Sequence, residues 1–373
     1  MAQRDLFELR VVACRALILC STLFGACAIP RVQEPLGGTE VPRLEADRVV
    51  LEDGAVLPLA QWLPARGRPL ATIVALHGMN EYRAAFADAG EQLAANDYAV
   101  YAYDQRGFGA TEQQGLWAGG NVLASDARQV AQLVRARHPG IPLYVLGESM
   151  GGTVLLHALT QEPRGWLDGA VLLAPAVWNR RDMPWYQRFG LDFLAHTFRG
   201  LKVSRPKSRT PSDNSETLRR LRDDPLVIKK MRVDALSGIA DLMDDVTDTR
   251  RDVGVPLLIL YGQNDEIIPA RPFCRWVTSL DDGGPWRLAV YPNGWHLLLR
   301  GLDAATAMSD LTAWLKNPGA ALPSECEAGK PLDEAACLAL VASAALRQSP
   351  QCPRDPGLGG SAGAATAARA TAG

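Results

Sequence analysis

One hexapeptide carries most of the structural information in this chain: Gly147-Glu148-Ser149-Met150-Gly151-Gly152. The apolar run 143–146 before it predicts a buried strand, and the run 153–159 after it predicts a helix. A G-x-S-x-G turn between a strand and a helix is typical of a nucleophile elbow, in which a strained turn exposes a serine hydroxyl. The flanking glycines fit, because side chains there would clash in so tight a turn. The alternative is an ordinary glycine-rich turn, so the interpretation depends on partners elsewhere in the chain.

Two such partners follow Ser149 in the chain order that α/β-hydrolases use, first an acid and then a histidine. Asp265 comes just after the apolar run 255–262, and His296 lies in the loop after the run 286–291. Both runs predict buried strands, and catalytic side chains of open α/β sheets lie beyond the carboxyl ends of strands. A serine needs a base, and the base needs a carboxylate that fixes its tautomer. We therefore predict Ser149 as nucleophile, His296 as base and Asp265 as the orienting carboxylate.

An oxyanion hole requires two backbone N–H groups beside the nucleophile. The residue after the nucleophile, Met150, supplies one, and the loop after an earlier strand supplies the other. The run 70–76 predicts that strand, and Met79 in the following loop is the candidate donor. His77 in the same loop is interpreted as a structural residue that orders the loop, rather than as a proton carrier.

The whole chain predicts an α/β fold with a mostly parallel sheet and helices on both faces. Apolar strand runs alternate with helical patterns such as 84–95 and 122–137, as in doubly covered parallel sheets. The sheet is expected to begin antiparallel, because Asp53-Gly54 between the runs 48–51 and 55–62 indicates a hairpin. The 373 residues are 47% hydrophobic with a formal net charge of −2, which argues against a nucleic-acid partner.

Several motifs resemble those of the monoacylglycerol lipase and lysophospholipase group of serine α/β-hydrolases. The likeness runs from about Leu51 to about Lys316. The resemblance implies an α/β-hydrolase domain over residues 45–317 that cleaves a lipid-like carboxylic ester through an acyl-enzyme, without a metal or organic cofactor. The motifs are His77–Arg83, Asp104–Gly109, Gly147–Gly152, Ser212-Asp213, Asp224–Leu226 and Gly294–Leu298.

Other functions stay open on the same residues. A transacylase, a peptidase or a small-ester esterase would use the same triad on a different acceptor or substrate. A non-catalytic lipoprotein that binds lipid would need only the fold, although such a protein has no need of Ser149, Asp265 and His296 together. Acyl chain length, head group, hydrolysis against acyl transfer, and oligomeric state are not readable from the sequence.

The insertion 177–248 is predicted to be a lid, and its first part, 177–209, matches the family poorly. Trp185, Phe189 and Phe193 recur at the spacing of one helix face. Eight basic residues accompany them against two acidic ones between 177 and 209. An aromatic face with basic flanks suits a membrane interface, and the alternative is that the aromatic side chains pack on the core while the charges are solvated. The basic residues are Arg180, Arg181, Arg188, Arg199, Lys202, Arg205, Lys207 and Arg209.

The first 27 residues are predicted to be an export signal of the bacterial lipoprotein type. A basic start, the apolar run 16–24 and small residues precede Cys27, which would carry the lipid anchor. Residues 28–44 would be a linker that tethers the hydrolase domain to the membrane in the cell envelope. The alternatives are an uncleaved anchor over 11–29, an ordinary cleaved signal with a periplasmic or secreted product, and a cytoplasmic protein.

Residues 318–373 are predicted to be an Ala/Gly/Pro-rich tail that is partly disordered. Asp333 could cap a short helix that runs to about Leu346. Three cysteines of the tail, together with Cys274, allow three full disulfide connectivities, and the sequence does not choose among them. No cysteine pair has the CxxC spacing of a zinc site, so no metal site is expected. The tail cysteines are Cys326, Cys337 and Cys352.

Overall fold

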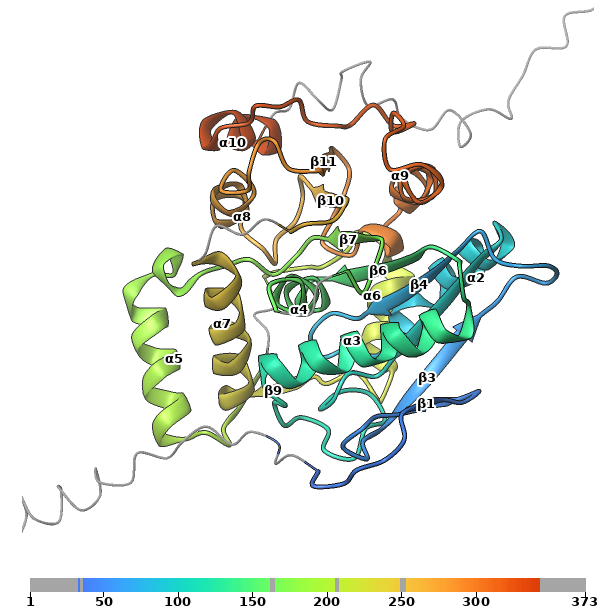
Figure 1. Cartoon of the computed structure of the whole chain (residues 1–373). Helices are drawn as coiled ribbons and strands as arrows, with labels where there is room; N and C mark the ends of the chain where they lie inside the picture. The colour runs from blue at the N-terminus through green and yellow to red at the C-terminus, as the bar shows by residue number, and fades with distance from the viewer. Residues whose placement is uncertain (1–32, 34–35, 162–164, 205–207, 249–252, 343–373) are drawn as a thin grey trace, which may run out of the picture.

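The computed structural model describes residues 33, 36–161, 165–204, 208–248 and 253–342. Its centre is a nine-stranded sheet with the order β1-β2-β3-β5-β4-β6-β7-β10-β11 (Figure 1). The central strands are apolar on both faces and are buried over their full length, as expected where helices cover both sides. The strands are β1 (Arg43–Leu44), β2 (Arg48–Val50), β3 (Val56–Trp62), β4 (Ala71–Leu76), β5 (Tyr98–Tyr103), β6 (Leu143–Glu148), β7 (Gly169–Leu173), β10 (Leu257–Gly262) and β11 (Trp286–Tyr291).

The pairing of the strands confirms the predicted sheet. Strands β5, β4, β6, β7, β10 and β11 pair in parallel. The opening strands β1, β2 and β3 pair antiparallel with one another, and β3 pairs antiparallel with β5. The turn between β2 and β3 contains Gly54 at a φ of 87°, a backbone conformation that glycine adopts without strain. All carboxyl ends of the parallel strands therefore lie at one edge of the sheet, where a site can be assembled from several loops.

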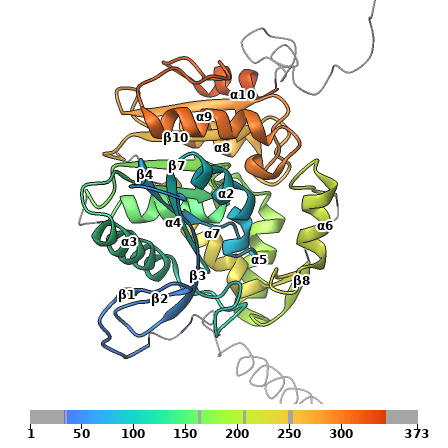
Figure 2. The ribbon, with the colours of Figure 1, turned by 90° about the vertical axis from the view of Figure 1, so that its right-hand side faces the viewer.

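Helices cover both faces of the sheet (Figures 1 and 2). Each face has its own apolar core. One core includes residues of α3 (Gly120–Arg137), α4 (Met150–Leu159) and α8 (Ala270–Val277). The other includes residues of α2 (Ala87–Ala95) and α9 (Ala304–Lys316). Two single-turn helices, η1 (Arg83–Phe86) and η3 (Leu298–Arg300), precede α2 and α9.

The predicted lid insertion forms a helical layer beside the sheet. Helix α7 packs on α4, and α5 packs on the outer side of α7 (Figure 1). A two-stranded antiparallel ribbon, β8 with β9, belongs to the same insertion. The elements of the insertion are η2 (Arg180–Asp182), α5 (Trp185–Thr197), β8 (Lys202–Ser204), α6 (Ser215–Asp223), β9 (Lys230–Arg232) and α7 (Val233–Thr247).

The folded part of the chain extends beyond residue 317, where the tail was expected to begin. Leu322, Cys326 and Leu332 are buried. Helix α10 (Glu334–Ala342) packs against α8. The Asp333 side chain accepts a hydrogen bond from Ala336 N at 2.7 Å, which confirms it as a cap of that helix. The tail is thus a structural part of the domain at least to Ala342.

A disulfide joins Cys274 of α8 to Cys337 of α10 across 63 residues of sequence. This pair selects one of the three connectivities that the sequence left open, and Cys326 is disulfide-bonded as well. Cys352 and the proposed lipid-bearing Cys27 lie outside the described residues. Among the residues that the structure does describe, none of the helices has the length and apolarity to cross a bilayer.

Candidate active site

Ser149 occupies a strained turn between β6 and α4. Its φ of 53° and ψ of −116° are rare for a residue with a side chain. A Cβ at Gly147 would lie 2.5 Å from Gly151 O, and a Cβ at Gly151 would lie 2.1 Å from Leu76 O. Only glycine allows these backbones to approach so closely, as the sequence predicted. The strain and the glycines are the properties of a nucleophile elbow, and they hold the Ser149 side chain at the carboxyl edge of the sheet.

His296 and Asp265 form a buried pair at the same edge. His296 Nδ1 lies 2.8 Å from Asp265 Oδ2, and the two side chains are 5% and 0% exposed. The other Asp265 oxygen accepts hydrogen bonds from the backbone amides of Ile267 at 2.7 Å and Ile268 at 2.9 Å, which fix the carboxylate in place. Because a carboxylate can only accept, His296 must donate from Nδ1, which leaves Nε2 available as a proton acceptor.

The loops that carry these two residues are packed backbone to backbone. A Cβ at Gly262 would lie 2.4 Å from Gly294 O, and Asn264 N donates to Gly294 O at 2.9 Å. Burial by itself lowers the pKa of His296, but the Asp265 carboxylate, followed by the carboxylates of Glu148 and Glu81, more than offsets this, so the pKa lies above its ordinary value. The structure thus brings together two of the three predicted catalytic side chains. Within its described residues no hydrogen bond joins Ser149 to His296, and such contacts are often loose in unliganded enzymes.

The loop that was expected to supply an oxyanion donor lies against the elbow. A Cβ at Gly78 would lie 3.4 Å from Ser149 Cβ and 3.7 Å from Glu148 O. Met79 therefore follows a residue in contact with the serine, and Met150 is the first residue of α4, where backbone N–H groups lack a partner within the helix. The oxyanion hole formed by Met79 and Met150 stays a prediction, with both residues next in sequence to groups at the elbow.

His77 orders the same loop, as expected. Its Nε2 accepts a hydrogen bond from Gln105 N at 3.0 Å, and its Nδ1 lies 2.8 Å from Gly78 O. Both ring nitrogens are therefore occupied by the backbone, with Nδ1 as donor. Complete burial lowers the pKa of His77, which keeps the ring neutral. A neutral, doubly bonded and buried histidine serves structure rather than proton transfer.

Three charged residues beside the triad were missed by the sequence analysis. Arg300 donates to both carboxylate oxygens of Glu81, at 2.5 and 3.0 Å, and to Glu148 Oε1 at 2.5 Å. A charged residue at the end of a buried apolar strand could have indicated this cluster, because a buried charge needs a partner. Glu148 ends β6 in this way, but its partner is 152 residues away in sequence.

Comparison with known proteins agrees with this geometry. Residues 67–303 match the family described as "Serine aminopeptidase, S33", which is more than half of the chain. This chain belongs to the S33 serine aminopeptidase family. It is 25% identical over 293 residues to the monoglyceride lipase of Mus musculus, covering 77% of this chain and 95% of that protein.

Two further relatives of this S33 family member are named for related activities. The monoacylglycerol lipase of Mycolicibacterium smegmatis is 24% identical over 259 residues, covering 68% of this chain and 90% of that protein. A soluble variant of the monoglyceride lipase of Saccharomyces cerevisiae, solved with a substrate analogue, superposes with a TM-score of 0.63 at 18% identity, covering 78% of this chain and all of that one. The structural likeness confirms the α/β-hydrolase fold.

The insertion of this S33 family member carries an exposed aromatic face, which we define as Trp185, Tyr186, Phe189, Phe193 and Phe198. The expected helix is α5, and Trp185 and Phe189 on it are 73% and 66% exposed. The rings contact one another, with Phe189 stacked on Phe193 at 6.2 Å between centroids. Of the two interpretations of this segment, the one in which these aromatic side chains pack on the core is wrong.

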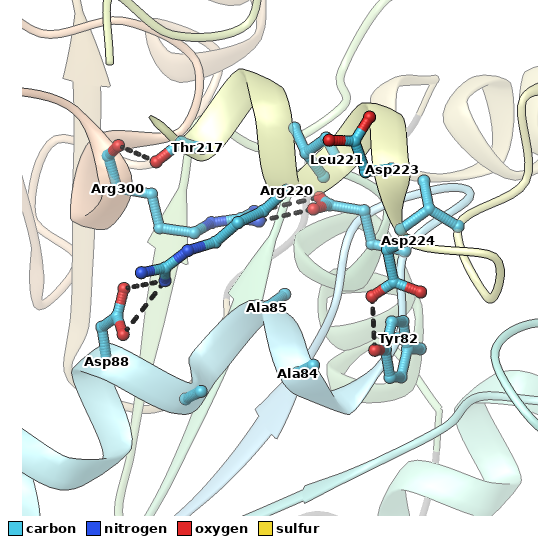
Figure 3. Close-up of a pocket in the computed structure, with 13 residues that line it drawn as sticks. Tyr82, Ala84, Ala85, Asp88, Thr217, Arg220, Leu221, Asp223, Asp224 and Arg300 are labelled. Carbon is cyan, nitrogen blue, oxygen red and sulfur yellow. Dashed lines mark hydrogen bonds and ion pairs between the residues drawn. The ribbon is translucent and has the colours of Figure 1, made fainter. Parts of the chain in front are cut away.

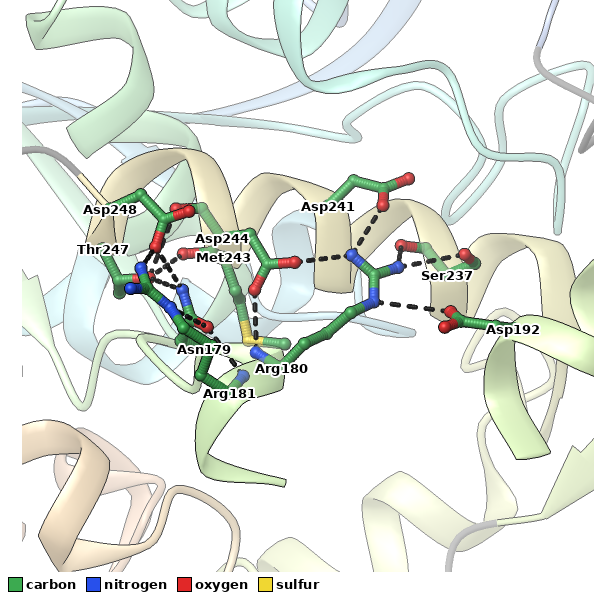
Figure 4. Close-up of polar contacts among 10 residues, drawn as sticks. All are labelled: Asn179, Arg180, Arg181, Asp192, Ser237, Asp241, Met243, Asp244, Thr247 and Asp248. Atoms are coloured by element: carbon green, nitrogen blue, oxygen red, sulfur yellow. Dashed lines mark hydrogen bonds and ion pairs between the residues drawn. The ribbon is translucent and has the colours of Figure 1, made fainter. Parts of the chain in front are cut away.

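The basic residues at the start of the insertion form ion pairs with acidic residues of the same insertion. Arg180 Nη1 lies 2.6 Å from Asp244 and 2.7 Å from Asp241, both on α7 (Figure 4). Arg181 forms an ion pair with Asp248 at the end of α7. Asn179 Nδ2 donates to Asp248 Oδ1 at 2.7 Å. Arg180 and Arg181 therefore join the start of the insertion to α7 and its end, with Arg180 15% exposed and Arg181 69% exposed.

Proposed function

We propose that this protein is a serine hydrolase that cleaves carboxylic esters of lipid-like substrates, with Ser149, His296 and Asp265 as its triad. The observation that carries the proposal is the buried His296–Asp265 pair at the sheet edge where the strained Ser149 turn also lies. The relatives named as monoglyceride lipases support an ester of the monoacylglycerol or lysophospholipid class. The S33 description names an aminopeptidase, so the nature of the scissile bond is what the experiment must decide.

The proposed reaction assigns one role to each of these residues. Ser149 Oγ attacks the ester carbonyl while His296 Nε2 takes its proton, and the amides of Met79 and Met150 bind the resulting oxyanion. Collapse of the tetrahedral intermediate breaks the ester bond, and His296 returns the proton to the departing alkoxide. A water molecule then repeats the attack on the acyl-enzyme and releases the fatty acid. Asp265 stabilises the imidazolium in both halves.

The surroundings of the oxyanion loop support an apolar acyl group. A narrow hollow of 10 Å³ lies beside Met79 and is lined mainly by apolar side chains. Such a volume holds about one water molecule at most. An acyl chain would need more room than this hollow offers. The apolar lining side chains are Met79, Phe108, Leu116, Trp117, Ile228, Met231 and Ala235.

We further propose that the aromatic face binds a lipid surface. Monomeric proteins rarely expose a contiguous aromatic patch, and such patches mark interaction sites. The face lies on the same insertion that contributes Ile228, Met231 and Ala235 to the hollow, so binding to lipid would hold this insertion at a surface that contains the substrate. Arg180 adds little charge to this surface, because its side chain is 15% exposed and paired with Asp244.

The anchor stays a proposal based on the sequence. A lipidated Cys27 would tether the domain to a bacterial membrane through residues 28–44. Metabolic labelling with a fatty acid tests it: the natural protein should be labelled and Cys27→Ser should not. Mass spectrometry that finds an unmodified start at another residue would remove the anchor and leave the catalytic proposal intact.

Activity-based labelling and a substrate panel test the enzymatic proposal. A fluorophosphonate should label Ser149 covalently, and peptide mapping should place the adduct there. The panel should contain monoacylglycerols, lysophospholipids, short p-nitrophenyl esters and an aminopeptidase substrate. Turnover of the peptide alone would favour a peptidase, and labelling without any turnover would favour a binding protein on the same fold. Water and an alcohol offered together would separate hydrolysis from acyl transfer.

A further inference from the structure

A buried ion cluster joins the three loops that carry the proposed reacting groups. Glu81 lies two residues after Met79, Glu148 directly precedes Ser149, and Arg300 lies four residues after His296. The Arg300 guanidinium spans the two carboxylates with three hydrogen bonds of 2.5 to 3.0 Å. Its side chain is 10% exposed, and those of Glu81 and Glu148 are 11% and 1% exposed. One side chain therefore connects the oxyanion loop, the elbow and the histidine loop.

Arg300 is also held through its own backbone. Its carbonyl accepts a hydrogen bond from Thr217 Oγ1 at 2.8 Å (Figure 3). The same carbonyl accepts a hydrogen bond from Ser212 Oγ at 3.3 Å. In the same region, Leu297 N donates to Pro211 O at 2.9 Å. These bonds to the insertion fix the backbone of Arg300. The Arg300 guanidinium in turn fixes the carboxylates of Glu81 and Glu148.

The cluster lies beside a cavity and also close to the serine. Arg300 and Glu81 line a cavity of 410 Å³ between α2 and α6, which does not include Ser149 (Figure 3). On the other side, Glu81 Oε2 and Ser149 Cβ lie 3.3 and 3.4 Å from the same point, the position of a Cβ at Gly78. The Glu81 carboxylate is therefore close to the nucleophile as well as to the cavity.

A contribution to the stability of the fold does not explain why such a cluster is present. The free energy lost when buried ions leave water is about as large as the free energy gained from their attraction. Replacement of a buried ion pair by apolar residues is therefore often neutral or stabilising for the fold. The cluster does affect its surroundings: the Glu148 and Glu81 carboxylates raise the pKa of His296, after the larger effects of burial and Asp265. Burial raises the pKa of Glu148, whereas Arg300 outweighs burial and lowers the pKa of Glu81.

We propose that Arg300 is a positioning residue. Through Glu81 and Glu148 it holds the oxyanion loop, the elbow and the histidine loop in fixed positions relative to one another. This proposal rests on the proposed hydrolase function. It assigns the cluster a role in setting the distance from Ser149 and His296 to the oxyanion donors, without contact to substrate. Lysine cannot replace this arginine, because a single ammonium group cannot span two carboxylates as a planar fork does.

The first test compares two buried arginines of the same chemistry. Arg106 also bridges two carboxylates, those of Asp53 and Asp126, but these belong to the β2–β3 turn and α3. With a short soluble ester, R300K should lower kcat by roughly 10- to 100-fold with little change in KM, as a small misplacement of reacting groups does. R106K should lower the melting temperature to a similar extent while it keeps kcat. The proposal is overturned if R300K retains kcat or loses no more of it than R106K.

The second test needs no turnover. E148Q keeps the shape of the side chain and an acceptor for Arg300, and it removes one negative charge beside His296. Proton NMR of the His296 ring should show that its Nδ1–H resonance moves in R300K and that its titration midpoint falls in E148Q. If neither variant changes the His296 signals, the proposal is wrong. If the natural protein reacts with no ester and no fluorophosphonate, the hydrolase proposal fails, while the NMR measurement still decides whether the cluster positions His296.

Discussion

Arg180 at the start of the insertion donates from Nη1 to Asp244 Oδ2 on α7 at 2.6 Å, and its backbone N–H donates to Asp244 Oδ1 at 2.8 Å. The same guanidinium reaches Ser237 O at 3.0 Å. These contacts tie the first turn of the insertion to the helix that packs on α4. The segment that carries the aromatic face is therefore attached to α7 at its N-terminal end.

Removal of this tie should loosen the insertion. R180M removes the guanidinium from Asp244 Oδ2 and from Ser237 O, while the backbone N–H of residue 180 still donates to Asp244 Oδ1. The loss should lower the free energy of unfolding by about 1–3 kcal/mol. Limited proteolysis should then cut near α5 sooner than in the natural protein. R188M is the matched control, because Arg188 is an exposed arginine on α5 itself. Equal denaturation midpoints and equal proteolysis of the two variants would contradict the structural role of Arg180.

The triad should act as a unit. Ser149→Ala and His296→Ala should each lower kcat by a factor of about 10⁴ to 10⁶, and the double variant should lose little more. Steady-state kinetics on a short ester, normalised to folded protein, measure this. Unchanged hydrolysis in Ser149→Ala would end the catalytic interpretation of the elbow.

The fold was predictable because its signals are local. Strands β4, β6 and β10 are continuous apolar runs, and the elbow is a contiguous motif whose glycines are required by contacts that the motif implies. The Ser149, Asp265 and His296 positions follow from chain order once these strands are placed. Each of these inferences uses residues within one element and the loop after it.

What the sequence could not show depends on contacts between distant segments. Arg300 meets Glu81 across 219 residues, and no local pattern marks that pairing. The helical spacing of Trp185, Phe189 and Phe193 identifies one face, but not whether it meets the core or solvent. The segment after residue 317 has the composition of a tail, yet isolated side chains such as Leu322 and Leu332 are buried.

The activity should fall at acid pH because His296 becomes protonated. The base must be neutral to accept the serine proton, so kcat/KM falls as the pH falls through its pKa. Burial lowers this pKa, but the carboxylates of Asp265, Glu148 and Glu81 together raise it, so the midpoint should lie above the ordinary value of 6.5. D265N should lower the midpoint in the residual activity and reduce kcat by roughly 10⁴-fold. A profile that is flat from pH 5 to 8 would contradict His296 as the base.

The disulfide should stabilise the end of the domain. It closes a loop with a sequence separation of 63 residues, and such cross-links typically contribute about 2–4 kcal/mol. The double variant C274A/C337A should therefore unfold at a lower denaturant concentration than the natural protein. A reductant should lower the midpoint of the natural protein more than that of the variant. Identical midpoints would show that this cross-link adds nothing to the stability of the fold.

The aromatic face should govern binding to lipid without affecting the chemistry. The variant W185S/F189S/F193S removes three rings that are exposed, so the fold should keep its stability. Burial of even one such side chain contributes about 1.5–3 kcal/mol, so the loss of three should weaken binding to neutral phosphatidylcholine vesicles by at least roughly tenfold. Sedimentation with vesicles measures this, with natural and variant proteins that both begin after residue 27 so that no lipid anchor contributes.

Two comparisons make that measurement decisive. L70S is the matched control, because Leu70 is also an exposed apolar side chain (57%) but precedes β4 and lies outside the insertion. It should bind vesicles as the natural protein does. Turnover of a short soluble ester should be nearly unchanged in the triple variant, whereas turnover of a vesicle-borne monoacylglycerol should fall with binding. A parallel loss of both activities would mean that the rings support the folded insertion, and unchanged vesicle binding would mean that this face meets something other than lipid.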